Sequence, residues 1–315
     1  MGQLNYRPLI KWIIVLGIFF FLGKMIWGNW SAVKDAPFTI RPFFLIVSTL
    51  IFALSYFIQV WAWHVTTEKL GVAVSFFETS EGWFYSQLGK YLPGKIWLFL
   101  GRLRYYDSRG KSKKAVSVAL YLEIVTVVMA AGLIFLISLI LFREVRFFYS
   151  ENPVLWLAIP ILIAFLSIHP RVLERILSWI LTRVGREPIS LPISYFDVLQ
   201  VLFISLLAWI VGGVGFCLFV DSVFPVSSHQ ILFLTGALAF SSMLGMVALF
   251  APSGLGVREG ALVYLLAFLM PASVAVVISI LTRLWMTFIE IGLIGVVYLL
   301  SRFRNGMKSK KNVRI

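Results

Sequence analysis

The sequence predicts an all-α fold, a polytopic integral membrane helical bundle of about eight spans with two segments broken by proline and glycine. Two observations predict it: 60% of the 315 residues are hydrophobic while 13% are charged, and the hydrophobic residues gather into long uninterrupted runs. A run of about 18 or more apolar residues with few charges is typical of a spanning helix. No extended linker divides the chain, so we expect one transmembrane domain over residues 1–315.

Eight apolar runs are candidate spans. They cover residues 9–27, 42–65, 115–142, 154–168, 198–224, 230–251, 257–270 and 272–300. No small-residue cleavage site follows the first run, which indicates an uncleaved span rather than a signal peptide. The fourth and seventh runs are short for a hydrocarbon core of about 30 Å. The seventh run is therefore either a full span or a half-helix that follows a re-entrant turn.

The formal net charge of +14 is distributed in a way that indicates a membrane rather than a nucleic-acid partner. With a cytoplasmic N-terminus, 21 lysines and arginines fall in the inside segments and five fall outside. Cytoplasmic loops of membrane proteins carry this excess of positive charge. We therefore expect a multi-pass protein of the inner (cytoplasmic) membrane, with both termini in the cytoplasm.

Two broken segments, residues 87–102 and 252–260, lie one in each half of the chain. The first contains Lys90, Pro93, Gly94, Lys95 and Arg102, and the second contains Pro252, Gly254, Gly256, Arg258 and Glu259. Irregular backbone survives at membrane depth only where protein covers it or where it lines a polar cavity. Broken helices in matching halves indicate the binding site of a transporter. Both segments could instead be ordinary turns, and an inverted repeat relating the halves is a hypothesis that rests on these breaks alone.

Ionisable side chains inside the spans are the other candidates for a site, because each costs about 2.5–3.5 kcal/mol to insert. Glu123 lies in the third span, and Arg283 and Glu290 lie on one face of the eighth. They either neutralise one another, as Glu123 with Arg258 and Arg283 with Glu259, or line a cavity for a charged lipid headgroup. In the second case, the glycine breaks leave backbone N–H groups that face an anion, and Arg258 and Arg283 bind its phosphate.

Three further patterns describe packing rather than chemistry. Residues 172–184 alternate apolar and charged side chains at helical spacing, which predicts an amphipathic helix on the inner membrane surface. Small residues at Ala237, Ser241 and Gly245 predict a close helix contact. Cys217, the single cysteine, is expected to be a packing residue.

The three histidines are widely scattered, so we predict no catalytic residue, no metal site and no cofactor.

The two broken segments resemble the signature motifs of the lysylphosphatidylglycerol synthase transmembrane family, also called the flippase-like family. The positions of Glu123, Arg283 and Glu290 are similar to the pattern of that family, and the resemblance runs from the second span to the eighth. In two-domain relatives the membrane part flips an aminoacylated phospholipid that a separate soluble domain makes. These 315 residues do not include that soluble domain, so the resemblance implies lipid handling rather than synthesis.

We therefore expect a flippase for a phospholipid or a lipid-linked intermediate with a charged headgroup. The alternatives are a membrane transferase acting on polyprenyl-linked or phospholipid-linked substrates, and a partner of such a lipid-modifying enzyme or glycosyltransferase. The headgroup, the energy coupling and the oligomeric state are open at this point. A transporter moves labelled lipid without a co-substrate, whereas a transferase needs a donor and makes a new product.

The threading through the membrane is testable by cysteine labelling in a Cys217→Ala background. A cysteine at Ser112 is expected to resist an impermeant maleimide in intact cells and to react after permeabilisation, because the charge distribution places residues 69–114 inside. A cysteine at Asp35, in the first outside loop, is the positive control. Labelling of the Ser112→Cys variant in intact cells would show that the topology is inverted.

Overall fold

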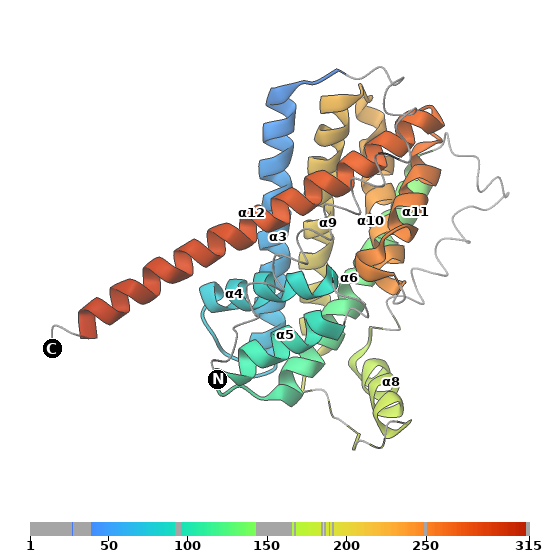
Figure 1. The fold of residues 1–315 in the computed structure, drawn as a ribbon. Helices are drawn as coiled ribbons and strands as arrows, with labels where there is room; N and C mark the ends of the chain where they lie inside the picture. Colours follow the sequence, from blue (N-terminus) through green and yellow to red (C-terminus); the bar gives the residue numbers. More distant parts are fainter. Residues whose placement is uncertain are drawn as a thin grey trace.

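The computed structural model describes residues 39–91, 96–142, 168–183, 192–248 and 251–312, together with Trp27 and a few single residues between 166 and 190. These ranges contain nine α-helices and three short 3₁₀ turns and no strand (Figure 1). The predicted all-α fold is confirmed there. The predicted spans at 9–27 and 154–168 lie outside the described residues, apart from Trp27, Leu166 and Ile168.

Five of the helices are long and apolar enough to cross a membrane. They are α3 (Pro42–Lys69), α6 (Lys113–Leu141), α9 (Tyr195–Val223), α10 (Ile231–Val247) and α12 (Ala272–Asn312). They match the predicted second, third, fifth, sixth and eighth spans closely. Their starts carry local signals, because Pro42 opens α3 and the Ser112 and Ser194 hydroxyls cap α6 and α9.

Helices α3 and α9 run antiparallel and define the two ends of the bundle (Figure 1). At one end Arg41 lies 3.3 Å from Asp221, and at the other Lys69 lies 2.6 Å from Asp197. We call these the Arg41 end and the Lys69 end. Glycines hold the two helices together along their length, since a Cβ on Gly215 would lie 3.0 Å from the backbone of α3.

The first broken segment forms a helical hairpin that enters the bundle from the Lys69 end. It consists of α4 (Phe76–Gln87), the turn η1 (Leu88–Tyr91) and α5 (Ile96–Asp107). Ser75 caps α4 and donates hydrogen bonds to the carboxylate of Glu78, which lowers the pKa of Glu78. At the tip, Gly89 lies so close to the backbone of α5 that a Cβ there would meet the Leu98 nitrogen at 2.4 Å.

The second broken segment forms a hairpin that enters from the Arg41 end. Helix α10 leads into the turn η4 (Pro252–Gly254), and α11 (Val257–Leu266) then returns beside it. Phe268, just after α11, contacts Phe233 near the start of α10. The turn uses positive φ angles at Ser253, Gly254 and Gly256, where glycine avoids the steric cost that other residues meet.

The tips of the two hairpins meet inside the bundle. Residues of η1 lie within 8 Å of residues of η4, measured between Cα atoms. Pro93, Gly94 and Lys95 of the first break lie outside the described residues, but the turn that precedes them is beside the second break. Hairpins that enter from opposite ends and meet at their tips bring the two halves of the chain to one place.

The seventh predicted span is a half-helix. Helix α11 contains 10 residues and is therefore about 15 Å long, half of a hydrocarbon core. Of the two interpretations that the sequence allowed for residues 257–270, the half-helix after a turn is the one that the structure has. In the described part of the chain, the seventh of the eight predicted spans is therefore not a full span.

Two of the packing predictions are confirmed, and the third is confirmed as a helix, while its place on the inner membrane surface stays a prediction. Helix α8 (Pro170–Arg183) covers the predicted amphipathic segment and buries Leu173 against α6 and α9, while Trp179 is exposed. Cys217 is buried in α9. Gly245, the last member of the predicted small-residue face, packs directly against Gly254 of η4.

The contact between Gly245 and Gly254 should be intolerant of any side chain. A Cβ on Gly254 would lie 2.6 Å from the Gly245 Cα, and its φ of 71° disfavours other residues. We expect Gly254→Ala to destabilise the protein by about 2–5 kcal/mol and to lower its apparent Tm in detergent. Gly260→Ala is the matched control, since nothing lies within 4 Å of its Cβ and helix propensity favours alanine by about 0.5–1 kcal/mol. Equal melting of the two variants would contradict the close contact.

Candidate functional site

A cavity of about 360 Å³ lies where the two hairpin tips meet. This volume falls within the usual range of ligand pockets. Most of its wall is apolar and comes from α3, α5, α6, α9 and α10. Its polar lining consists of Ser55, Tyr56, Gln59, Gln87, Lys90, Tyr91, Arg102, Glu123, Ser242, Ser253, Arg258, Arg283, Thr287 and Glu290. Six of the predicted ionisable site residues therefore face one space.

Arg102 and Glu123 form an ion pair on one side of the cavity. Arg102 is fully buried, and its Nη1 lies 2.5 Å from the Glu123 carboxylate. The guanidinium lies over the ring of Trp63, while the indole N–H of Trp83 donates to the other oxygen of Glu123 at 2.8 Å. Each charge is thus compensated by several neighbours, which is what a buried pair requires. This arrangement joins α5 of the first hairpin to α6.

Lys90 and Glu290 form a second pair at the centre of the cavity. The Lys90 ammonium on η1 lies 2.5 Å from Glu290 Oε2 on α12. The hydroxyls of Tyr56 and Tyr91 lie 3.5 Å from the same oxygen. The pair therefore connects the tip of the first hairpin to the last long helix.

Arg283 and Glu259 form a third pair behind the second hairpin. Arg283 Nη1 lies 3.6 Å from Glu259, and Nη2 donates to the Ser253 hydroxyl at 2.6 Å. Glu259 also accepts a 2.7 Å hydrogen bond from the Gly256 N–H at the start of α11. The pairing of Arg283 with Glu259 is one of the alternatives that the sequence suggested, and the structure contains it.

Two expectations about this region are wrong. Glu123 pairs with Arg102 rather than with Arg258, because the first hairpin folds back and places α5 beside α6. The backbone N–H groups at the second break do not both face an open anion site. Gly254 donates to the Ala251 carbonyl and Gly256 donates to Glu259, so these two donors are already used inside the hairpin.

Arg258 is the cation of the cavity that lacks a carboxylate. Within the described ranges it forms no ion pair, and its guanidinium contacts the Met286 sulfur, a weak acceptor. It projects from the first turn of α11 beside Gly245. Its side chain is half-buried in a largely apolar cavity, where a guanidinium without a counter-ion is costly, so Arg258 has the environment expected of a ligand for an anion.

Three other polar atoms that face the cavity have no hydrogen-bond partner among the described residues: Gln59 Nε2, Ser242 Oγ and Glu290 Oε1. Buried polar groups are nearly always hydrogen-bonded. Sequence reasoning missed Gln59 and Ser242, although Gln59 is a polar residue inside an apolar run and could have been noticed. They line the same cavity as Arg258, so the site offers hydrogen-bonding groups as well as charges.

The remaining predicted site residues either shape the cavity or lie outside the residues that the structure describes. Glu259 reaches it through Arg283, and Gly254 and Gly256 form the turn that orients Arg258. Pro252 begins that turn. Pro93, Gly94 and Lys95 lie outside the described residues, so their place relative to the cavity stays a prediction.

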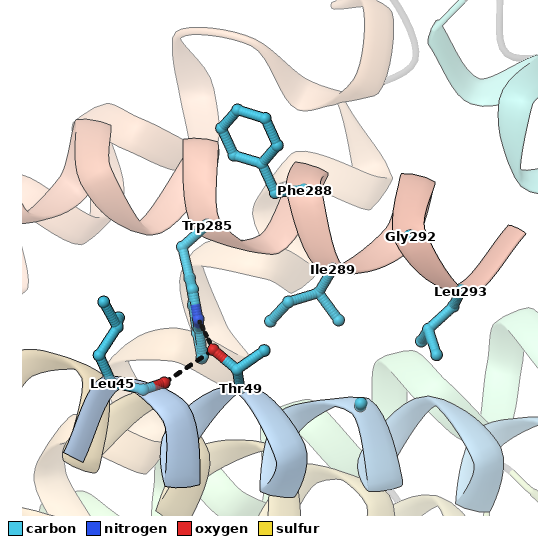
Figure 2. Close-up of a pocket in the computed structure, with 8 residues that line it drawn as sticks. Leu45, Thr49, Trp285, Phe288, Ile289, Gly292 and Leu293 are labelled. Carbon is cyan, nitrogen blue, oxygen red and sulfur yellow. Dashed lines mark hydrogen bonds between the residues drawn. The ribbon is translucent and has the colours of Figure 1, made fainter. Parts of the chain in front are cut away.

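An apolar pocket of about 410 Å³ lies between α3 and α12, behind the cavity wall (Figure 2). The Trp285 indole N–H donates to the Thr49 hydroxyl at 3.0 Å, and that hydroxyl donates to the Leu45 carbonyl. Trp285 also stacks on Phe219 and contacts Phe52, and so it separates this pocket from the polar cavity. The described lining of this apolar pocket contains no charged residue, so it offers no site for a charged group.

Comparison with known proteins identifies one family. The family model described as Lysylphosphatidylglycerol synthase TM region matches residues 9–295, which is most of the chain. No curated protein and no solved structure matches it. The matched range contains both hairpins and every residue of the cavity named above.

The pair of Arg102 and Glu123 should behave as a structural element. Arg102→Gln leaves the Glu123 carboxylate without its cation, so we expect a loss of about 3–5 kcal/mol in the free energy of unfolding. Lys113→Gln is the matched control, because Lys113 forms an exposed pair with Asp107 at the end of the same hairpin, worth about 0–1 kcal/mol. The double variant Arg102→Gln/Glu123→Gln should be less destabilised than the sum of its single variants. An Arg102→Gln protein that melts like the wild type would contradict the structural role of the pair.

Proposed function

The chain belongs to the lysylphosphatidylglycerol synthase TM region family, and from this premise we propose that it moves a phospholipid or a lipid-linked intermediate across the cytoplasmic membrane. The headgroup occupies the cavity between the hairpin tips while the acyl or prenyl tails stay in lipid. The observation that carries the proposal is Arg258, a cation that faces the cavity and has no carboxylate partner among the described residues. The candidate substrates are phospholipids and intermediates linked to a lipid phosphate. Each carries a phosphate, and a guanidinium binds this anion well.

The architecture supports movement of a substrate rather than mere binding. In many transporters, broken helices from two halves of the chain meet at a site near the middle of the bilayer, and access alternates between its two sides. Here the hairpins of α4 with α5 and of α10 with α11 enter from opposite ends and meet at the cavity. In this proposal the two hairpins are re-entrant segments, and they enter the membrane with opposite orientations.

Charge pairing narrows the set of residues that bind the phosphate. The sequence suggested Arg258 and Arg283 together. Arg283 is held by Glu259 and Ser253, so we assign it the role of positioning the η4 turn. Arg258 alone then contacts the phosphate directly.

In the proposed membrane topology, the Lys69 end of the bundle faces the cytoplasm. Exposed cations at that end, among them Arg104, Lys113 and Lys114, would then face the anionic inner leaflet. Each contributes about 1 kcal/mol to attraction toward such a surface. The same topology puts the amphipathic helix α8 on the inner side.

The role of Arg258 is testable in vesicles that contain a fluorescent lipid labelled on its acyl chain. Arg258→Gln should fold and melt like the wild-type protein, because it strands no partner carboxylate, but it should reduce lipid movement by about tenfold or more. Arg258→Lys should restore little of the rate if the binding is bidentate. Accessibility of the label to an impermeant quencher measures the movement. Arg41→Gln, which removes a guanidinium from the exposed pair with Asp221, is the control and should leave the rate unchanged.

Two results would contradict the proposal. One is a stable Arg258→Gln protein that moves lipid at the normal rate. The other is a wild-type protein that moves no lipid in purified vesicles but forms a new lipid product when a donor is added, which would make it a transferase.

A further inference from the structure

We infer that the cavity selects a headgroup of net charge −1, made of a single phosphodiester that carries hydroxyl groups and no ammonium group. This inference rests on the proposed function and deepens it, because it names the chemical class of the substrate. It comes from the count of charges around the cavity and from the polar atoms that lack partners there.

The described charges at the cavity do not cancel. The cations are Lys90, Arg102, Arg258 and Arg283, and the acids that contact them are Glu123, Glu259 and Glu290. Three ion pairs account for three of the four cations. Among the described residues the site therefore carries one excess positive charge, located on Arg258.

The charge of the ligand decides whether this excess is compensated. A phosphodiester brings one negative charge and makes the occupied cavity neutral. A zwitterionic headgroup leaves the excess in place, and a lysyl ester of phosphatidylglycerol, with two ammonium groups and one phosphate, adds to it. A headgroup that fills the cavity displaces the water there, and uncompensated charge away from water is expensive, so the neutral complex is favoured over both of the others.

The unpartnered atoms indicate hydroxyl groups rather than an ammonium group. Glu290, which is 2% exposed, has an unpartnered acceptor in Oε1, while Gln59 has an unpartnered donor in Nε2. A hydroxyl both donates and accepts, so hydroxyls can satisfy both atoms, whereas an ammonium group only donates. An ammonium group at Glu290 would also share that carboxylate with the Lys90 ammonium, only 2.5 Å from Oε2. Two cations on one carboxylate repel each other.

Two kinds of lipid have this chemistry. One is a glycerophospholipid whose phosphate carries a polyol, and the other is a polyprenyl monophosphate that carries one hexose. Both present one phosphodiester charge and several hydroxyls. The charges and the unpartnered atoms do not distinguish between these two lipids. The experiment therefore includes both of them.

The test measures movement of four acyl-labelled glycerophospholipids in separate phosphatidylcholine vesicles that contain the full chain. They are phosphatidylglycerol, phosphatidylethanol, phosphatidylethanolamine and the lysyl ester of phosphatidylglycerol. Phosphatidylethanol has the charge of phosphatidylglycerol without its hydroxyls, which makes it the matched control. A labelled polyprenyl phosphohexose forms the fifth arm.

We expect phosphatidylglycerol or the polyprenyl phosphohexose to move about tenfold faster than phosphatidylethanolamine or the lysyl ester. Phosphatidylethanol should be intermediate, about fivefold slower than phosphatidylglycerol if that is the substrate. In a Gln59→Leu/Ser242→Ala variant the difference between phosphatidylglycerol and phosphatidylethanol should shrink while the discrimination by charge persists. If only the polyprenyl lipid moves, the inference holds with that source.

Failure of the inference is distinguishable from failure of the proposed function. Movement of the lysyl ester or of phosphatidylethanolamine as fast as the anionic lipids overturns the inference alone. If no lipid moves faster than in protein-free vesicles, the proposed function fails, and native mass spectrometry of the protein in an equimolar mixture of the five lipids decides the inference. Preferential retention of an anionic hydroxyl-bearing lipid supports it, and retention without preference overturns it.

Discussion

The contact between two helix breaks is the constraint on which the rest of the structure depends. A chain that interrupts a helix at membrane depth exposes backbone polar groups that lipid cannot satisfy. This protein places the two interruptions against each other, with η1 beside η4, and closes the turn with its own hydrogen bonds, such as that from the Gly254 N–H to Ala251. The breaks then cover one another, and the space left between them is the cavity.

The charged residues follow from that contact. Once the two tips meet, the cations they carry need compensation, and the neighbouring long helices supply it through Glu123 on α6 and Glu290 on α12. Glu259 does the same for Arg283 from within the second hairpin region. These pairs neutralise charges that become buried when the site assembles. In the proposed function the substrate binds to what these pairs leave over among the described residues, namely the Arg258 guanidinium and a few polar atoms without hydrogen-bond partners.

Sequence reasoning was most successful where the information is local. Apolar run length located α3, α6, α9, α10 and α12 to within a few residues, apart from the unforeseen extension of α12 past residue 300, and the shortness of the seventh run already suggested that α11 is a half-helix. The proline and glycine breaks indicated that two distant segments share a site. Their tips do lie together, although Pro93 and Gly94 themselves are not described.

The partners of individual charges could not be predicted in the same way. One of the alternatives that the sequence left open paired Glu123 with Arg258, but the partner is Arg102, which reaches it because α5 folds back along α6. No local pattern encodes that return. The Gly256 N–H was expected to face an anion and instead binds the carboxylate of Glu259, three residues later. Gln59 was overlooked because a single amide in an apolar span has no motif around it.

The absence of side chains between Gly245 and Gly254 also affects how the protein can move. Because backbone packs on backbone there, the η4 turn and the C-terminal end of α10 have little room to move against each other. The first hairpin is held by ion pairs instead, from Lys90 to Glu290 on α12 and from Arg102 to Glu123 on α6. In the proposed function, displacing the first hairpin therefore separates opposite charges, and an anion bound beside them would change the energy of that step.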